Sequence, residues 1–178
     1  MSSPIWQPVT WLIFHHITKN YREEYRQHYI DFFETFKIII PCKICRTHYN
    51  ENLNKQGMMI DQNINSQNIF NWTVDLHNTV NRQNGKRAWT HERANQYYSK
   101  NRLNDNLIKL FLIEYTKMNF RKSPEKTDKL FDMLRNIVYL HPNDQKKNKL
   151  IDFKEKFELR HDTFKNWIYA VLLILKSK

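Results

Sequence analysis

The stretch FFETFKIIIPCKIC, residues 32–45, joins an aromatic segment to a proline and to the only two cysteines of a 178-residue chain. Aromatic side chains recur here at three- and four-residue spacing: Tyr25, Tyr29, Phe32, Phe33 and Phe36. This spacing predicts one helix, from about residue 22 to 39, whose aromatic stripe belongs to a core. Pro41 ends that helix, because its ring cannot continue the hydrogen-bond pattern. Cys42 and Cys45 then open the next helix, which we expect to end near Gly57.

The rest of the chain also favours helices. Only two glycines occur, and no stretch alternates apolar and polar residues at strand spacing. So few glycines also exclude a glycine-rich phosphate loop or a dinucleotide fingerprint. Further helices are expected over about 4–20, 65–85, 90–100, 107–118, 124–140 and 149 to the end, with a turn at HPND, 141–144. The predicted fold class is all-α, with a five-helix unit over 1–104 and a second helical unit over 105–178.

The net charge of +11 raises the possibility of a nucleic-acid site, because basic faces gather phosphates. Residues 1–104 carry 13 Lys and Arg against 8 Asp and Glu, and residues 105–178 carry 16 against 10. Since the excess is spread along the chain and no motif accompanies it, we expect a solvated surface and no nucleic acid as a partner. Such a surface also suits an acidic protein partner.

Neither a leader nor a membrane span is expected. The first ten residues, MSSPIWQPVT, lack a basic region followed by an apolar run, so they do not resemble a secretory signal. The longest apolar run, residues 167–175, is nine residues long, whereas a membrane span needs about 20. We expect that run to form a buried or interface helix that begins near Asp162. Its apolar stripe is Ile168, Val171, Leu172 and Leu175.

The cysteine spacing alone allows three uses of the pair. At a helix start, backbone N–H groups and the helix dipole favour a thiolate on Cys42, which suits redox chemistry. Zinc is the second use, with Cys42, Cys45, His48 and His77 as four ligands, although no second cysteine pair exists. The third is two reduced thiols in a helical core. Redox chemistry is favoured, but a single C-x-x-C leaves all three open.

A second polar cluster lies in FNWTVDLHNTVNRQNGK, residues 70–86. On a helix, His77, Val80, Asn81 and Asn84 share one face, and Asn78 lies beside it. Imidazole and amide groups among apolar residues can bind the edge of a planar heteroaromatic ring while the apolar atoms pack on its plane. The plainer alternative is one buried histidine with a hydrogen-bond partner, but several buried polar groups would each need such a partner.

Three segments together carry a resemblance: WQPVTWLIFHH (6–16), FFETFKIIIPCKIC (32–45) and HNTVNRQNGK (77–86). They are similar, in order and spacing over about residues 4–100, to the Erv/ALR flavin-linked sulfhydryl oxidases, especially those of large DNA viruses. The matching residues are Trp11 and His15, then Pro41, Cys42 and Cys45, and finally His77, Asn78, Val80, Asn81 and Lys86. Nothing specific is implied for residues 105–178.

The resemblance implies FAD in the mouth of a four-helix bundle, with its isoalloxazine ring against a Cys42–Cys45 disulfide. By analogy Cys45 is the flavin-proximal sulfur and Cys42 the one that substrate attacks. The residues expected at the cofactor are Trp11, His15, His77, Asn78, Val80, Asn81 and Lys86, with Tyr98 against the adenine. The implied enzyme is an FAD-dependent thiol oxidase that forms disulfides in proteins and passes electrons to oxygen, producing hydrogen peroxide. A homodimer is also implied, acting in a host cytoplasm or virion if the protein is viral.

The sequence departs from the family pattern in three ways. Gln7 and Pro8 stand where the family often has Gly and Arg. Two cysteines provide neither the usual additional structural disulfide nor a shuttle pair, so a reduced protein substrate or a thioredoxin-like relay protein must reach Cys42 directly. The alternative function is a non-enzymatic helical zinc-binding module with a basic nucleic-acid or protein-binding surface. The oxidase interpretation assigns no residue to a metal.

Overall fold

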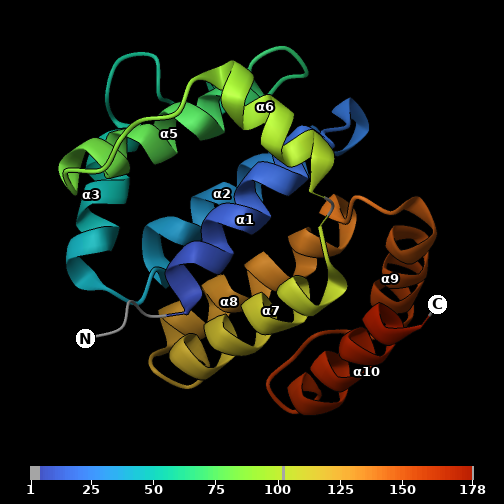
Figure 1. Ribbon diagram of the computed structural model, residues 1–178. Helices are drawn as coiled ribbons and strands as arrows, with labels where there is room; N and C mark the ends of the chain where they lie inside the picture. Colours follow the sequence, from blue (N-terminus) through green and yellow to red (C-terminus); the bar gives the residue numbers. More distant parts are fainter. Residues whose placement is uncertain (1–4, 102, 178) are drawn as a thin grey trace.

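The computed structural model describes residues 5–101 and 103–177, and it shows helices joined by short loops (Figure 1). No strand occurs within those residues, which confirms the all-α prediction. The predicted beginning of the first helix at residues 2–4 lies outside them. The elements are α1 (Trp6–Lys19), η1 (Glu23–Tyr25), α2 (Arg26–Ile39), α3 (Lys43–Leu53), α4 (Ile60–Asn63), α5 (Ile69–Gln83), α6 (His91–Lys100), α7 (Asp105–Asn119), α8 (Pro124–Ile137), η2 (Val138–Leu140), α9 (Asp144–Lys156) and α10 (Phe164–Lys176).

The aromatic stripe of α2 forms the centre of the core, as its spacing predicts. Phe32, Phe33 and Phe36 have no exposed surface. Phe14 of α1 meets all three rings edge-on, with centroids 5.9, 4.8 and 4.7 Å away respectively. Edge-to-face pairs of this kind add to the hydrophobic gain of burial. Helices α1 and α2 are therefore held together mainly by aromatic packing.

Helix α1 lies between two layers of the molecule. It packs against α5 and α6 on one side and against α7 on the other, while α8 covers α2 (Figure 1). On the α7 side, the hydroxyl groups of Thr10 and Tyr115 are 2.9 Å apart, and both side chains are buried. The Thr10 hydroxyl donates to the Trp6 carbonyl, so Tyr115 is the donor to Thr10. The division at residue 104 stays a prediction, and one hydrophobic core extends across it.

The C-terminal end differs from the single helix predicted from residue 149 onward. Helix α9 ends at Lys156 and α10 begins at Phe164. Between them, the Thr163 hydroxyl donates to the Glu158 carbonyl and accepts the N–H of Arg160, which closes a compact loop. This loop precedes α10, whose buried residues are Phe164, Trp167, Val171 and Leu175. Of the predicted apolar stripe, Val171 and Leu175 are buried and Ile168 and Leu172 are half-buried. Helix α4 was also not predicted.

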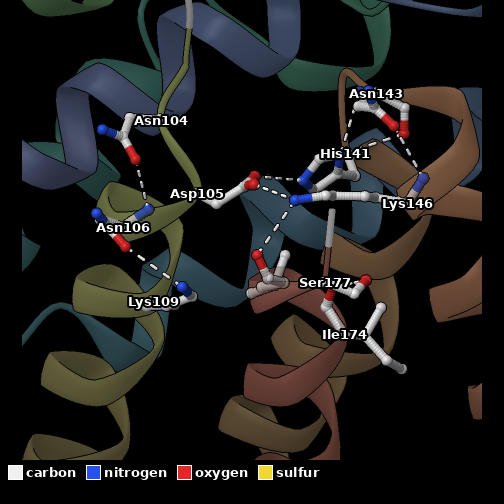
Figure 2. Close-up of polar contacts among 10 residues, drawn as sticks. Asn104, Asp105, Asn106, Lys109, His141, Asn143, Lys146, Ile174 and Ser177 are labelled. Atoms are coloured by element: carbon white, nitrogen blue, oxygen red, sulfur yellow. Dashed lines mark hydrogen bonds and ion pairs between the residues drawn. The ribbon is translucent and has the colours of Figure 1, made fainter.

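A polar network fixes the end of α10 to the rest of the molecule (Figure 2). Lys146 pairs with Asp105, at the start of α7, and donates to the Leu175 carbonyl at 3.2 Å. The Nε2 of His141 lies 3.2 Å from Asp105, and its Nδ1 accepts the backbone N–H of Asn143 at 3.1 Å. Burial opposes ionisation of Asp105, but the Lys146 and His141 contacts outweigh it and lower the pKa of the carboxyl. The network therefore joins α7, α9 and α10.

None of the helices in the described part of the chain combines the length and the hydropathy that crossing a bilayer requires.

Candidate active site

The two cysteines lie at the start of α3 and form a disulfide, with Cα atoms 5.2 Å apart. Cys42 is the N-cap residue, and its sulfur accepts the backbone N–H of Cys45 at 3.2 Å. Both residues are partly exposed. The prediction that the pair opens a helix is confirmed. Sulfurs joined in this way cannot act as thiolate metal ligands, and the described residues contain no group of three His, Cys, Asp or Glu suited to a metal.

Residues around the pair come from three segments. The side-chain amide nitrogen of Gln7, in α1, lies 3.7 Å from the Cys45 sulfur. Arg46 donates to the Ile40 carbonyl at 2.6 Å, which fixes the segment that enters α3. Ile44, between the cysteines, is 67% exposed, and Lys43 is exposed as well. The outer side of the disulfide therefore faces solvent through an apolar and a basic side chain.

A cluster of rings lies where α1, α5 and α6 meet. Trp11 stacks on His77, with ring centroids 4.1 Å apart and planes 3° from parallel. The Nε2 of His15 and the Nδ1 of His77 share a hydrogen bond of 3.0 Å. The His15 ring lies 4.6 Å from the Tyr98 ring, and His16 meets Tyr98 edge-on. The structure thus brings together four of the predicted site residues.

The surroundings of His15 and His77 lower the pKa of both imidazoles, which favours their neutral forms. Burial, followed by the neighbouring His77, holds the pKa of His15 well below its usual value. Burial and the charge of Lys86 lower the pKa of His77 to about 4. His15 Nδ1 is buried and has no hydrogen-bond partner within residues 5–101 and 103–177. A buried polar atom without a partner is rare in folded proteins and points to a missing ligand or water.

The other predicted residues of α5 and its following loop lie close to His77 in sequence and on the helix. Asn81 is one turn beyond His77, and its side-chain amide has no hydrogen bond to another described residue. The Lys86 N–H donates to the Asn81 carbonyl at 2.8 Å. Gly85, at φ 65°, provides the left-handed backbone conformation that brings the Lys86 N–H back to the Asn81 carbonyl. Val80 is half-buried beside them.

Asn78 lies elsewhere on α5 and has a different set of contacts. Its amide nitrogen donates to the Trp89 carbonyl, and its amide oxygen accepts the Trp89 N–H, both at 2.8 Å. This reciprocal pair attaches the segment before α6 to α5, so it fixes the position from which α6 presents Tyr98. The structure therefore does not bring the Asn78 amide into the ring cluster. The contact of Asn78 with a cofactor stays a prediction, and Trp89 was missed.

One face of α1 connects the disulfide to the ring cluster. Gln7, Trp11 and His15 follow one another at four-residue spacing, so they lie on the same side of the helix. Eight residues of α-helix span about 12 Å along the axis. Gln7 was noted in the sequence only as a departure from a pattern, although its spacing from Trp11 placed it on this face. The arrangement is a partly exposed disulfide and a largely buried ring cluster joined by one face of α1.

Comparison with known proteins places these features in one matched region. The model of the Erv1 / Alr family matches residues 8–102. The chain is 32% identical over 98 residues to a probable FAD-linked sulfhydryl oxidase of Acanthamoeba polyphaga mimivirus, a match that covers 53% of this chain and 68% of the relative. No solved structure is significantly similar to the chain. The matched residues include the cysteine pair and the whole ring cluster.

Proposed function

Because this chain belongs to the Erv1 / Alr family, we propose that it is an FAD-dependent thiol oxidase that forms disulfide bonds in protein substrates. The observation that carries this proposal is the partly exposed Cys42–Cys45 disulfide at the beginning of α3. The disulfide is the oxidising group that a thiol substrate meets first. Beside it, α1 presents one face to both the sulfurs and the ring cluster.

The residues of the cluster are suited to FAD. A flavin needs flat apolar contacts for its rings and polar groups for their edges. Trp11 and Tyr98 supply aromatic faces, and the neutral imidazoles of His15 and His77 can donate or accept hydrogen bonds. The buried Nδ1 of His15, which has no partner among the residues that the structure describes, is a group to which a bound cofactor can hydrogen-bond. The Asn81 amide makes no hydrogen bond to another described residue, Val80 adds an apolar surface, and Lys86 provides positive charge that suits a phosphate.

The chain's own chemistry is thiol–disulfide exchange. A substrate thiolate attacks Cys42 Sγ, the Cys42–Cys45 bond breaks, and Cys45 leaves with the electron pair as a thiolate. A second substrate thiolate then attacks the substrate sulfur of the mixed disulfide, and Cys42 leaves as a thiolate. The Cys45 N–H and the start of α3 stabilise that negative charge. The substrate dithiol is oxidised by two electrons, the cysteine pair is reduced, and two protons are released.

FAD, when bound, supplies the two-electron acceptor that restores the cysteine disulfide and transfers the electrons to oxygen, giving hydrogen peroxide. In this proposal, Cys45 lies on the cofactor side of the disulfide and Cys42 on the solvent side. The exposed Lys43, which follows Cys42, and the exposed Ile44, between the two cysteines, support direct access by a reduced protein or a thioredoxin-like relay protein.

We infer a homodimer and activity in a host cytoplasm or virion, in keeping with the viral relative. Helix α10 buries Val171 and Leu175 within the subunit, while Tyr169 and Leu173 are 64% and 47% exposed and are available for a contact. A monomer at micromolar concentration in light scattering would remove the dimer from this proposal.

The decisive experiment compares Cys45→Ser with the exchange of Thr47, an exposed residue of the same helix, for alanine. We expect Cys45→Ser to abolish thiol-dependent oxygen consumption and to retain FAD, since helix faces and not sulfur hold the cofactor. Its unpaired Cys42 should capture a reduced substrate as a stable mixed disulfide. Thr47→Ala should keep full activity. Full activity in Cys45→Ser, or a colourless protein that contains stoichiometric zinc, would refute the proposed function.

A further inference from the structure

We propose that Gln7 is a catalytic residue of this reaction, because its side-chain amide donates a hydrogen bond to the thiolate that Cys45 becomes when the disulfide opens. The inference rests on the proposed function and adds to it a residue that the family pattern does not supply. Gln7 Nε2 already lies 3.7 Å from the Cys45 sulfur, within the range of hydrogen bonds to sulfur. The contact joins α1 to α3, and Figure 1 shows the beginning of α1 beside the segment that enters α3.

The two sulfurs have different donors. Cys42 Sγ, at the N-cap, receives the backbone N–H of Cys45. Cys45 lies within the first turn of α3, and the side-chain donor placed at its sulfur belongs to Gln7. The two half-reactions require this separation, because first Cys45 and then Cys42 leaves as a thiolate. Each leaving sulfur therefore has its own N–H group in position before the bond breaks.

The Gln7 contact becomes stronger as the reaction proceeds. A divalent disulfide sulfur is a weak acceptor, whereas a thiolate carries a full negative charge and accepts strongly. An interaction that is weak in the ground state and strong once charge develops lowers the barrier instead of only binding the starting material. The electron pair of the broken S–S bond moves onto Cys45, which is the sulfur that faces Gln7.

We assign the hydrogen bond to the Cys45 thiolate to a neutral amide and not to a charged side chain. The first turns of α1 and α3 contain no acidic residue, so no carboxylate of these turns opposes a thiolate. The nearby cations are Lys43, which is exposed, and Arg46, whose guanidinium donates to the Ile40 carbonyl. Gln7 thus provides a directed neutral donor that attracts the thiolate without pairing permanently with it.

The test measures the pKa of Cys45 directly, in a Cys42→Ser background where it is the only thiol. The ultraviolet absorbance of the thiolate and the rate of alkylation are followed against pH, with and without Gln7→Met. Methionine keeps the length of the side chain but removes its N–H groups. We expect the pKa of Cys45 to rise by about one unit, as the loss of a hydrogen bond to a charged group implies.

Gln7→Glu provides a second variant with a distinct signature. A carboxylate at this position repels the thiolate and should raise the pKa of Cys45 further than methionine does. Because acidic residues stabilise the N-terminal turn of a helix, the same variant should not lose thermal stability. A raised thiol pKa without lost stability separates an electrostatic role from a structural one. The matched control is Gln96→Met on α6, whose amide donates to Glu92, and it should leave the pKa unchanged.

The reduction potential of the intact pair gives an independent measurement. The comparison is made at a pH where Cys45 is ionised in both reduced proteins. A tenfold weaker stabilisation of the thiolate should lower the reduction potential of the Gln7→Met pair by about 30 mV. An unchanged pKa and an unchanged potential in Gln7→Met would overturn the inference, even if the protein is an active oxidase. If the pKa shifts but no flavin or oxidase activity is found, the contact stands and the proposed function fails.

Discussion

Replacing Phe111 with alanine tests whether the two halves of the chain unfold as one unit. Phe111, in α7, is fully buried, and its ring lies 6.5 Å from Phe32, 6.2 Å from Phe36 and 4.8 Å from Tyr115. Phe-to-Ala changes in such cores cost about 3–5 kcal/mol, because the apolar contacts are lost and a cavity remains. For a chain of this size, each kcal/mol lowers the melting temperature by about 2–4 °C. We therefore expect a fall of about 6–20 °C.

The assay follows unfolding by far-ultraviolet circular dichroism and by release of flavin, whose predicted site is made by α1, α5 and α6. Because α7 and α8 share a core with α1 and α2, both signals should shift together to lower temperature. Leu173→Ala is the control, since Leu173 is 47% exposed on α10 and its loss should change stability by no more than about 0.5 kcal/mol. A flavin-release transition that stays at the wild-type temperature would refute the reasoning and favour independent units.

Two further predictions concern the ring cluster. His77→Ala should retain the helical fold but lose flavin during dialysis, because the loss of one buried hydrogen bond costs about 1–3 kcal/mol. If both His77→Ala and Asn81→Ala retain all their flavin, the flavin pocket lies elsewhere. The pKa of His77 is 6.5 in the unfolded chain and about 4 in the folded protein, so between these pH values the unfolded state binds more protons. The free energy of unfolding should therefore fall by about 3 kcal/mol as the pH is lowered from 6.5 to 4. Denaturant titrations of His77→Gln should show a smaller fall.

Local patterns in the sequence account for much of the fold. The spacing of Phe32, Phe33 and Phe36 identified the core face of α2, and Pro41 marked where that helix ends, because both effects act within a few residues. The start of the last helix near Asp162 was predicted, and α10 begins at Phe164. The end of α9 at Lys156 was not predicted, and the Thr163 contacts that close the loop after it depend on the path of the backbone between residues 158 and 163.

The site was predictable to the extent that it depends on helix faces. Trp11 and His15 come from α1 and His77 from α5, and their side chains contact one another. Their contact with a cofactor stays a prediction. Two features depend on tertiary packing and were not foreseen. The approach of Gln7 to Cys45 requires the crossing of α1 and α3, and the engagement of Asn78 by Trp89 requires a particular path of the loop before α6.

The position of α1 between two layers limits how this protein can evolve. Its site face carries Gln7, Trp11 and His15, while Thr10 on the other side bonds to α7. Each residue turns an α-helix by about 100°, so an insertion or deletion of one residue within α1 would rotate one set of side chains out of place relative to the other. An insertion or deletion of one residue cannot keep both the site-facing and the α7-facing side chains in register. Divergence among relatives should therefore occur by substitution in α1 and by length variation only in the loops.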